Sequence, residues 1–156
     1  MIEWCKLVNA YTDMKKLAIQ VQKLHEAAKI PKFAHDNDAG MDLCSTEEVT
    51  IEPGDHTTIP TGIALAIPDG YVGLIWDKSG NAIKRGLKVL GGVVDAGYRG
   101  EIKIGIVNHG KEAHTFGVGD KVAQMLLQEV AHANFEEVDS LDETERGEGG
   151  FGSTGK

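Results

Sequence analysis

The sequence predicts an all-β fold, and two patterns support that prediction. Short apolar segments recur along the chain and are separated by turn-forming sequences rich in Gly, Pro, Asn and Asp. Residues 17–22 (Leu-Ala-Ile-Gln-Val-Gln) follow the period of two that is typical of a half-buried strand. Many short strands at this spacing indicate a sandwich or a barrel. The segments expected to form strands are residues 17–22, 49–51, 57–67, 71–76, 87–90, 101–108 and 121–130.

Two further segments are expected to be helical. In residues 2–16, apolar side chains recur at roughly helical spacing, which predicts a short amphipathic helix outside the main fold. Residues 79–86 predict a second short helix. Residues 139–149 are dominated by acidic and polar side chains and are typical of a solvated linker. We therefore divide the chain into an N-terminal extension (1–16), a β-barrel core (17–138) and a linker with a phosphate-binding tail (139–156).

Composition limits the classes of function. The chain has 156 residues, 41% of them hydrophobic and 26% charged, which is enough for one domain with a real core. A net charge of −8 argues against binding long nucleic acid. No apolar run is long enough to cross a membrane, and no signal peptide is evident at the start. With only two cysteines, we expect reduced thiols and a cytoplasmic protein, or a nuclear or host-cytosolic one if it is viral.

The glycine-rich tail is the most informative stretch. Five of the eleven residues in 146–156 are glycines, so the backbone can close around a ligand with its N–H groups pointing inward. Phe151 offers a flat face for stacking. We expect a tail that is flexible when empty and closes over a ligand with a phosphate end and an aromatic end. Its side chains suited to phosphate are Arg146, Ser153, Thr154 and Lys156.

The same tail matches two patterns of phosphate-binding loops, G-x-G-x-x-G from Gly147 and G-x-x-x-x-G-K from Gly150. Both patterns need a strand before them and a helix after them, and the sequence stops at Lys156, so neither a dinucleotide-binding fold nor a P-loop is expected. A disordered tail without a ligand remains an equal alternative on composition alone.

A second unusual stretch is Gly-Gly-Val-Val-Asp-Ala-Gly-Tyr-Arg-Gly at residues 91–100. A tight hairpin flanked by glycines can present its backbone N–H and C=O groups to the edge of a flat ring. Asp95 is a candidate general base, and Tyr98 a candidate for packing on a sugar. The same residues also fit a plain turn with its Asp side chain bonded locally, and spacing does not decide between these alternatives.

Three weaker patterns lie elsewhere. Residues 77–80 (Asp-Lys-Ser-Gly) fit a phosphate-binding turn or an ordinary surface turn, and residues 119–124 and 39–43 fit the starts of strands. The histidines and cysteines lack zinc-ligand spacing, and neither H-E-x-x-H nor G-x-S-x-G occurs. We therefore expect neither a zinc site held by the protein nor a serine hydrolase.

Taken together and in order, five segments resemble the motifs of the trimeric dUTPase (deoxyuridine triphosphate nucleotidohydrolase) family. The resemblance covers roughly residues 17–156, and its third and fifth segments are highly specific. The five segments are 39–43 (Ala-Gly-Met-Asp-Leu), 79–80 (Ser-Gly), 92–100 (Gly-Val-Val-Asp-Ala-Gly-Tyr-Arg-Gly), 119–124 (Gly-Asp-Lys-Val-Ala-Gln) and 146–155.

The resemblance implies a jelly-roll or distorted β-barrel subunit and a homotrimer whose active sites are shared between subunits. It implies hydrolysis of dUTP to dUMP and pyrophosphate with Mg²⁺, which limits dUTP and supplies dUMP for thymidylate synthesis. Asp95 would activate the attacking water, and Tyr98 would lie against the deoxyribose. The backbone around residues 89–93 would pair with the uracil edge, and Asp42 would face the metal through water.

The remaining positions of the resemblance would bind the triphosphate and close the site. Phe151 would cover the uracil ring, and the other tail residues would engage the γ-phosphate. The substrate-binding positions that the resemblance implies are Lys78, Ser79, Gly80, Val89, Gly91, Gly92, Val93, Asp95, Tyr98, Gln124, Arg146, Phe151, Gly152, Ser153 and Thr154.

One departure from the family and two alternative functions stay open on the sequence alone. The second motif usually reads Arg-Ser-Gly, whereas here Lys78 follows Asp77, so the planar two-pronged contact of arginine is lost and Asp77 competes for the lysine. The alternatives are a dCTP deaminase-type enzyme of the same fold and a non-catalytic nucleotide-sensing regulator.

Overall fold

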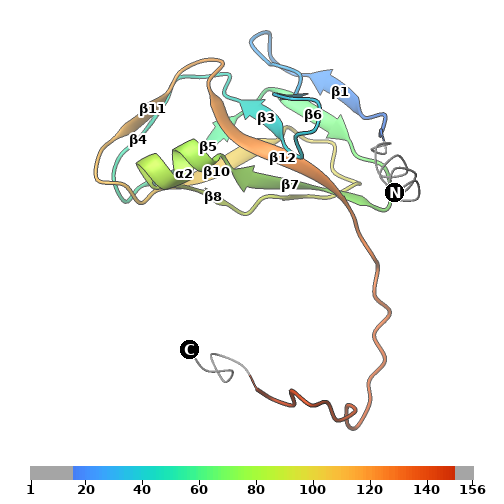
Figure 1. Cartoon of the computed structure of the whole chain (residues 1–156). Coiled ribbons are helices and arrows are strands. Elements are labelled where there is room, and N and C mark those ends of the chain that lie inside the picture. The colour runs from blue at the N-terminus through green and yellow to red at the C-terminus, as the bar shows by residue number, and fades with distance from the viewer. Residues whose placement is uncertain (1–15, 150–156) are drawn as a thin grey trace, which may run out of the picture.

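The computed structural model describes residues 16–149, and this part of the chain confirms the all-β prediction (Figure 1). Its helix is α2 (Ser79–Arg85). Its strands are β1 (Gln20–Lys23), β2 (Lys32–Phe33), β3 (Met41–Cys44), β4 (Val49–Ile51), β5 (His56–Pro60), β6 (Ile63–Ala66), β7 (Tyr71–Asp77), β8 (Leu87–Leu90), β9 (Val93–Val94), β10 (Lys103–Asn108), β11 (His114–Phe116) and β12 (Lys121–Glu129).

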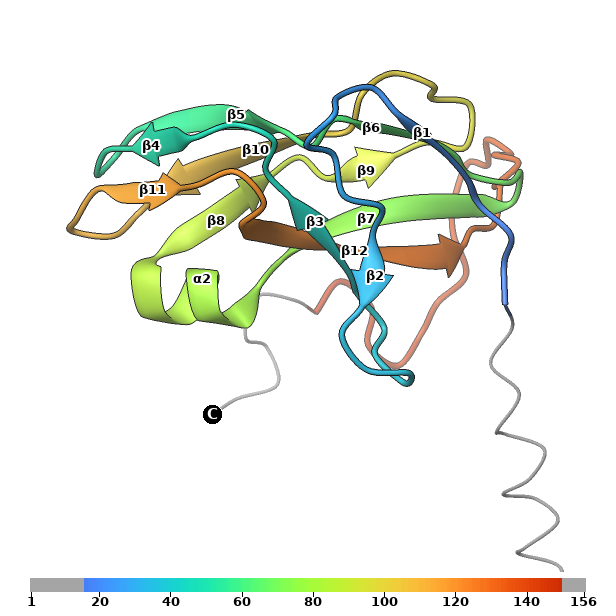
Figure 2. The same cartoon turned by 90° about the horizontal axis from the view of Figure 1, so that it is seen from above.

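The strands pair into antiparallel sheets whose neighbours are mostly distant in sequence. The largest sheet has the order β2-β3-β12-β7-β9, and a three-stranded sheet has the order β5-β10-β8. The pairs β1-β6 and β11-β4 complete the described body. In Figure 2 the strands β4, β5, β10 and β11 lie at one end of the body, and α2 lies beside β8.

The core lies between these sheets and is built from alternating inward-facing positions. Along β10, for example, Ile104 and Ile106 are almost fully buried while Lys103 is exposed. The other sheets also contribute buried apolar side chains to this core. Apolar contacts therefore hold together sheets that share no hydrogen bonds. Removing such a side chain from water stabilises the fold by about 1.5–3 kcal/mol. The largest fully buried side chains include Leu43, Ile51, Ile59, Phe116 and Met125.

The predicted boundaries hold where turn residues define them. The expected strands at 49–51 and 87–90 are β4 and β8. The predicted helix is α2, which ends where Gly86 adopts φ 72° and donates its N–H to Ala82. The single expected strand at 57–67 is wrong in one respect, because the chain turns at Gly62 (φ 66°) and forms two strands there.

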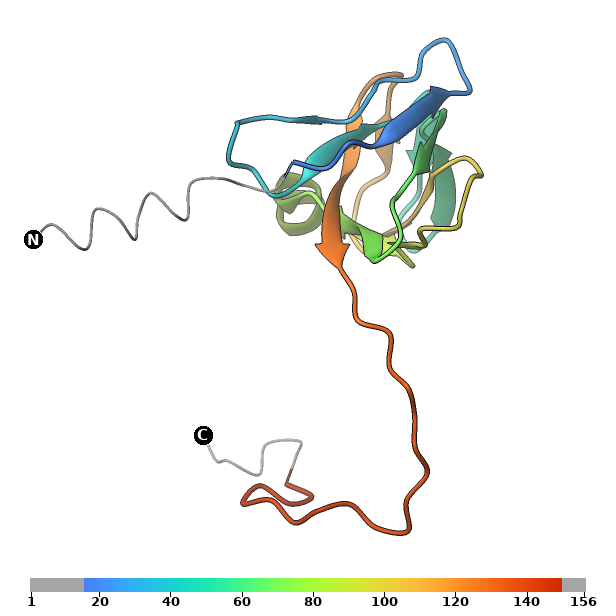
Figure 3. The ribbon, with the colours of Figure 1, turned by 90° about the vertical axis from the view of Figure 1, so that its right-hand side faces the viewer.

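Beyond β12 the chain leaves the sheets. Residues 130–149 contain no strand or helix and run away from the body in Figures 1 and 3. The predicted N-terminal helix lies outside the described residues except for Lys16. In the described part, Cys44 is a buried free thiol, and burial raises its pKa. No helix in residues 16–149 is long and apolar enough to cross a membrane.

A buried amide fixes the β10–β11 end of the body, which leads to a prediction. Asn108 is fully buried, donates to the carbonyls of Ile51 and Glu112 (2.9 and 2.8 Å) and accepts from the Gly110 N–H (2.8 Å). Asn108→Ala leaves these groups without their partner, so urea unfolding should show a loss of about 2–3 kcal/mol. The exposed Asn37→Ala should change the free energy of unfolding by less than about 0.5 kcal/mol. Equal effects of the two variants would contradict a structural role for the Asn108 amide.

Candidate functional site

Three charged side chains meet on the outer face of the five-stranded sheet, and we call Asp42, Lys78 and Lys121 the charged cluster. Asp42 lies on β3, Lys78 follows β7, and Lys121 begins β12. One carboxylate oxygen of Asp42 pairs closely with the Lys78 ammonium, and the other lies 2.5 Å from the Lys121 ammonium. Burial raises the pKa of Asp42, but the two lysines outweigh it, so its pKa lies below the ordinary 3.8. The cluster therefore holds one carboxylate between two cations.

A β-bulge brings the Lys121 side chain to this face. The pairing of β12 with β3 shifts between Lys121 and Ala123, and both Val122 and Ala123 are buried. Without the extra residue, side chains at 121 and 124 would lie on opposite faces of a strand with period two. The bulge lets Lys121 and Gln124 both lie beside Asp42, which is the pairing partner of Gln124.

Gln124 is held in place from two sides. Its side-chain amide donates to the backbone carbonyl of Asp77 (2.9 Å). On the other side it lies against Gly40, where a Cβ would collide with its amide oxygen and come within 3.0 Å of its Cδ. The glycine of the Ala39-Gly40-Met41 sequence is thus needed for close packing.

Asp77 does not compete for Lys78 as the sequence suggested. Its carboxylate accepts the Val89 N–H (2.6 Å) and pairs with the Lys88 ammonium (2.6 Å), both on β8. Lys78 is therefore free of Asp77 and bound to Asp42 instead. The same contact occupies the Val89 N–H, one of the groups expected to face the uracil edge.

The start of α2 lies next to the charged cluster. Ser79 and Gly80 are exposed, and Asn81 behind them is buried. The Asn81 amide donates to the carbonyls of Lys121 and Val122 (3.3 and 2.9 Å) and accepts from Arg85 (2.8 Å). These bonds fix α2 on β12, so the exposed Ser79-Gly80 turn has a defined position beside Lys78.

A separate pocket of about 260 Å³ lies at the hairpin that carries Asp95, and we call it the hairpin pocket. Gly91 and Gly92 both adopt positive φ (71° and 107°), and the Gly92 carbonyl accepts the Ile75 N–H at 2.7 Å. A Cβ on Gly92 would come within 2.7 Å of the Ile75 carbonyl oxygen, so glycine is required there. The residues that line the pocket are Ile75, Gly92, Val93, Val94, Asp95, Tyr98, Glu101, Ile102 and Lys103.

The turn after the hairpin sets the positions of Asp95 and Tyr98. The Tyr98 N–H donates to the Asp95 carbonyl (3.1 Å), and the Tyr98 hydroxyl donates to the Glu101 carbonyl (3.0 Å). Tyr98 is 47% exposed and borders the pocket. The arrangement places a carboxylate and an aromatic ring at one small cavity, as a base and a sugar platform would require.

In one chain the predicted residues form two groups rather than one. The hairpin pocket includes Asp95, Tyr98, Gly92 and Val93 but not Asp42, Lys78 or Gln124. In Figure 2, α2 and β9 lie apart, with α2 beside β8 and β9 beside β7. Apolar side chains of the sheet's outer face lie between the groups. Leu126 on β12 and Leu74 on β7 are partly buried there, whereas Val93 on β9 and Trp76 on β7 are exposed.

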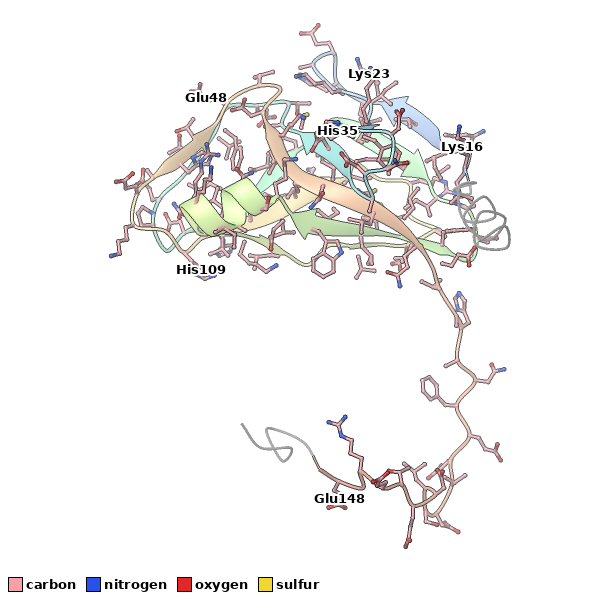
Figure 4. The ribbon with its side chains drawn as sticks, viewed as in Figure 1. Lys16, Lys23, His35, Glu48, His109 and Glu148 are labelled. Carbon is pink, nitrogen blue, oxygen red and sulfur yellow. The ribbon has the colours of Figure 1, made fainter. Side chains whose placement is uncertain are left out.

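Of the predicted tail residues, the structure describes Arg146, which lies with neither group. Arg146 donates from Nε to the Gly149 carbonyl (2.9 Å) in a local turn. Glu148, two residues later, is well separated from the sheets in Figure 4. The other predicted tail residues, Phe151, Gly152, Ser153 and Thr154, lie outside the described residues.

The described residues could hold a magnesium ion only if a bound ligand supplied further oxygen atoms. Among the described residues, no group of three or more His, Cys, Asp or Glu side chains is placed to hold a metal ion. Both oxygens of Asp42 already face lysines. Mg²⁺ commonly binds through one or two carboxylates together with substrate phosphates and water. The donor set therefore suits an ion that arrives with further oxygen ligands.

Several residues of these groups were not predicted from the sequence. Lys121 lies within the fourth motif, but it was not predicted to lie at the site. Val122 and Ala123 after it are both buried, which is the mark of the bulge that brings Lys121 to this face. Glu101 and Lys103 line the hairpin pocket, and their spacing of two along an extended segment could have placed them together. The contact of Asp77 with β8 joins residues 11 and 12 positions apart across α2, and no local pattern indicates it.

Comparisons with known proteins agree with the motif resemblance. The dUTPase family model matches residues 26–155. The chain is 48% identical over 145 residues to the deoxyuridine 5'-triphosphate nucleotidohydrolase of Clostridium tetani, covering 92% of this chain and all of that protein.

Solved structures of phage proteins share the fold. A Staphylococcus bacteriophage 80alpha dUTPase variant with dUpNHpp gives a TM-score of 0.82 at 31% identity and covers 90% of this chain and 100% of its own. A dUTPase variant from phage phi11 of S. aureus, described with a structural Mg(II) ion, gives a TM-score of 0.77 at 30% identity. The match covers 81% of this chain and 100% of that chain. Since the family model and these relatives span most of the sequence, the chain belongs to the dUTPase family.

Proposed function

We propose that this chain hydrolyses dUTP to dUMP and pyrophosphate, with Asp95 as the base that activates water for attack on the α-phosphate. The observation on which this rests is the hairpin pocket, where Asp95 and Tyr98 border one cavity beside a hairpin of two glycines. Water transfers a proton to the Asp95 carboxylate as its oxygen bonds to the α-phosphorus, and the bond to the pyrophosphate oxygen breaks. A positioned base of this kind supplies about 10²–10⁴-fold in rate.

Recognition of uracil would come from the backbone of the hairpin. The Val89 N–H is already bonded to Asp77, so the base edge would be met at Gly91, Gly92 and Val93. Gly92 packs against the β7 backbone, which gives the hairpin a fixed shape. Uracil and cytosine differ in their donors and acceptors, and a buried group left unpaired costs about 1–3 kcal/mol. This cost favours uracil over cytosine.

The triphosphate would be bound by the charged cluster and its neighbours. Lys78 offers a compact point charge where the family usually has arginine, and Ser79, Gly80 and Gln124 lie close to it. The cations would offset part of the substrate's negative charge. Arg146 and the tail residues 151–154 would close over the γ-phosphate and the base and exclude bulk water.

A homotrimer with shared sites would join the two groups of residues. In one chain they are separate, and the apolar stretch between them includes Trp76 and Val93, which are 53% and 68% exposed. Such a stretch is typical of a surface that another protein covers. If a second copy packs there, the hairpin pocket of one subunit faces the charged cluster of the next. The segment after β12 leads away from its own body (Figure 3) and would bring its tail to another subunit's site.

Magnesium would arrive with the substrate and neutralise part of the triphosphate charge. Asp42 would hold its water shell, and Lys78 and Lys121 would then be released from Asp42 to bind phosphate oxygens. In this proposal, Lys78 and Lys121 pair with Asp42 while no substrate is bound, and they bind phosphate oxygens once it is.

The base assignment predicts a separation of binding from turnover. Asp95→Asn keeps the shape of the side chain but removes its basicity, so pyrophosphate release from dUTP should fall at least about 10²-fold. Calorimetric binding of dUpNHpp should stay within about threefold of the parent chain. The exposed Asp69→Asn should be as active as the parent, and near-normal turnover in Asp95→Asn would remove the assignment. Parallel assays of pyrophosphate release from dCTP, dTTP and UTP, together with an assay of ammonia release from dCTP, would separate this function from that of a deaminase.

Shared sites predict complementation between two inactive variants. Asp95→Asn lacks the base, and a chain that ends at Glu145 lacks the tail, so each homotrimer should be inactive. After unfolding and refolding as a mixture, some sites combine an intact hairpin with an intact tail from different chains, and turnover should return to roughly a quarter of the parent rate. Native mass spectrometry would confirm mixed trimers of the 16.8 kDa chain. Mixed trimers without activity would contradict the shared site.

The role given to Asp42 predicts a change in magnesium dependence. Asp42→Asn removes the acceptor of the metal's water shell, so the Mg²⁺ concentration for half-maximal turnover should rise by roughly tenfold, the usual lower range for loss of an outer-shell partner. The exposed Asp55→Asn changes the net charge equally and should leave the magnesium titration unchanged. Identical titrations for the two variants would exclude Asp42 from the metal's surroundings.

A further inference from the structure

We infer that Gly100 is a positioning residue of the hairpin pocket, because its missing side chain leaves the space in which the Tyr98 ring lies. This inference rests on the proposed function of the pocket as the dUTP site. It concerns a residue that does not itself line the pocket and acts only through the ring.

The geometry at Gly100 is unusually close. A Cβ built on Gly100 would collide with the hydroxyl oxygen of Tyr98 and come within 2.6 Å of its Cζ and 3.0 Å of its Cε2. The ring is therefore folded back over the backbone at position 100. Tyr98 also lines the hairpin pocket, together with Asp95, Ile102 and Lys103. The ring thus contacts Gly100 and borders the space proposed for the sugar.

The far end of the ring is fixed by a chain of contacts. The Tyr98 hydroxyl donates to the Glu101 carbonyl (3.0 Å), and the Glu101 carboxylate accepts the Gly62 N–H (2.8 Å). Next to it, the Ile102 N–H donates to the Ile63 carbonyl (2.8 Å). The turn is in this way anchored to Gly62 and to Ile63, the first residue of β6, and the hydroxyl bond holds the ring against Gly100.

A methyl group at position 100 should displace the ring rather than the backbone. Gly100 does not have a positive φ, so alanine can adopt its conformation. The atoms that the methyl would meet belong to a side chain that is 47% exposed and able to rotate. Because Tyr98 lines the hairpin pocket, we expect its displacement from Gly100 to disturb the space for deoxyribose.

The first test is the kinetics of Gly100→Ala with dUTP. The displaced ring would hinder substrate binding but would not affect proton transfer to Asp95. KM should therefore rise at least about tenfold, while kcat stays within about threefold. Gly97→Ala is a matched control, since it lies in the same turn, has no positive φ and its Cβ would meet nothing within 4 Å. Gly97→Ala should keep the parent KM. Equal KM values for Gly100→Ala and the parent would overturn the inference.

A double-mutant cycle decides whether Gly100 acts through the ring. In a Tyr98→Ala background the obstacle is gone, so adding Gly100→Ala should change KM by less than about twofold. An undiminished effect in that background would mean a backbone role and would overturn the inference. If Gly100→Ala alone failed to fold, recovery of folding in the Tyr98→Ala background would support the inference, and continued failure would overturn it.

The same experiments separate this inference from the proposed function. A parent chain that releases no pyrophosphate from dUTP would remove both. An active parent that loses activity with Asp95→Asn but is indifferent to Gly100→Ala would remove only the role of Gly100.

Discussion

The register of β12 between β3 and β7 is the constraint on which the phosphate side of the molecule depends. It sets Gln124 opposite Asp42 on one side and opposite Trp76 on the other. Side chains alternate along a strand, so a slip of one residue would turn Gln124 into the core and Met125 out of it. Met125 is fully buried, and its packing holds the register. The bulge before Ala123 then adds Lys121 to the same face. Hydrophobic burial in the core therefore fixes the position of polar groups on the surface.

The hairpin side depends on backbone contact instead. Gly92 lies directly against the β7 backbone, and the carboxylate of Asp77, two residues after Ile75 on β7, accepts the Val89 N–H. Both contacts start from β7, the strand that leads into Lys78. One strand thus supports the groups proposed to bind the base and those proposed to bind phosphate. The two groups lie apart within one chain. In the proposed trimer with shared sites, a rearrangement of β7 would therefore affect two different active sites.

Much of the fold and the candidate residues could be predicted from the sequence, for identifiable reasons. Turn residues such as Gly86 mark the ends of elements, so α2 and β8 are where the local pattern placed them. Asp95 and Tyr98 share a pocket because a single short turn carries both. Contacts between distant segments could not be foreseen. The pairing of Lys78 with Asp42 depends on sheet order, and the two-residue strands β2 and β9 are too short to show a period. The break at Gly62 was missed because the apolar pattern continues through it.

The carboxylate of Asp42 between two lysines has a consequence for the empty protein. It acts as an internal counterion, attached to the scaffold at high effective concentration, and leaves the three groups with one net positive charge. Chloride or inorganic phosphate from the surroundings would have to displace a tethered competitor without offering the displaced carboxylate a new partner. A triphosphate accompanied by a divalent cation can do so, since the cation gives the displaced carboxylate a new partner. In the proposed function, this exchange would favour a metal-loaded polyanion before any part of the base or sugar is recognised.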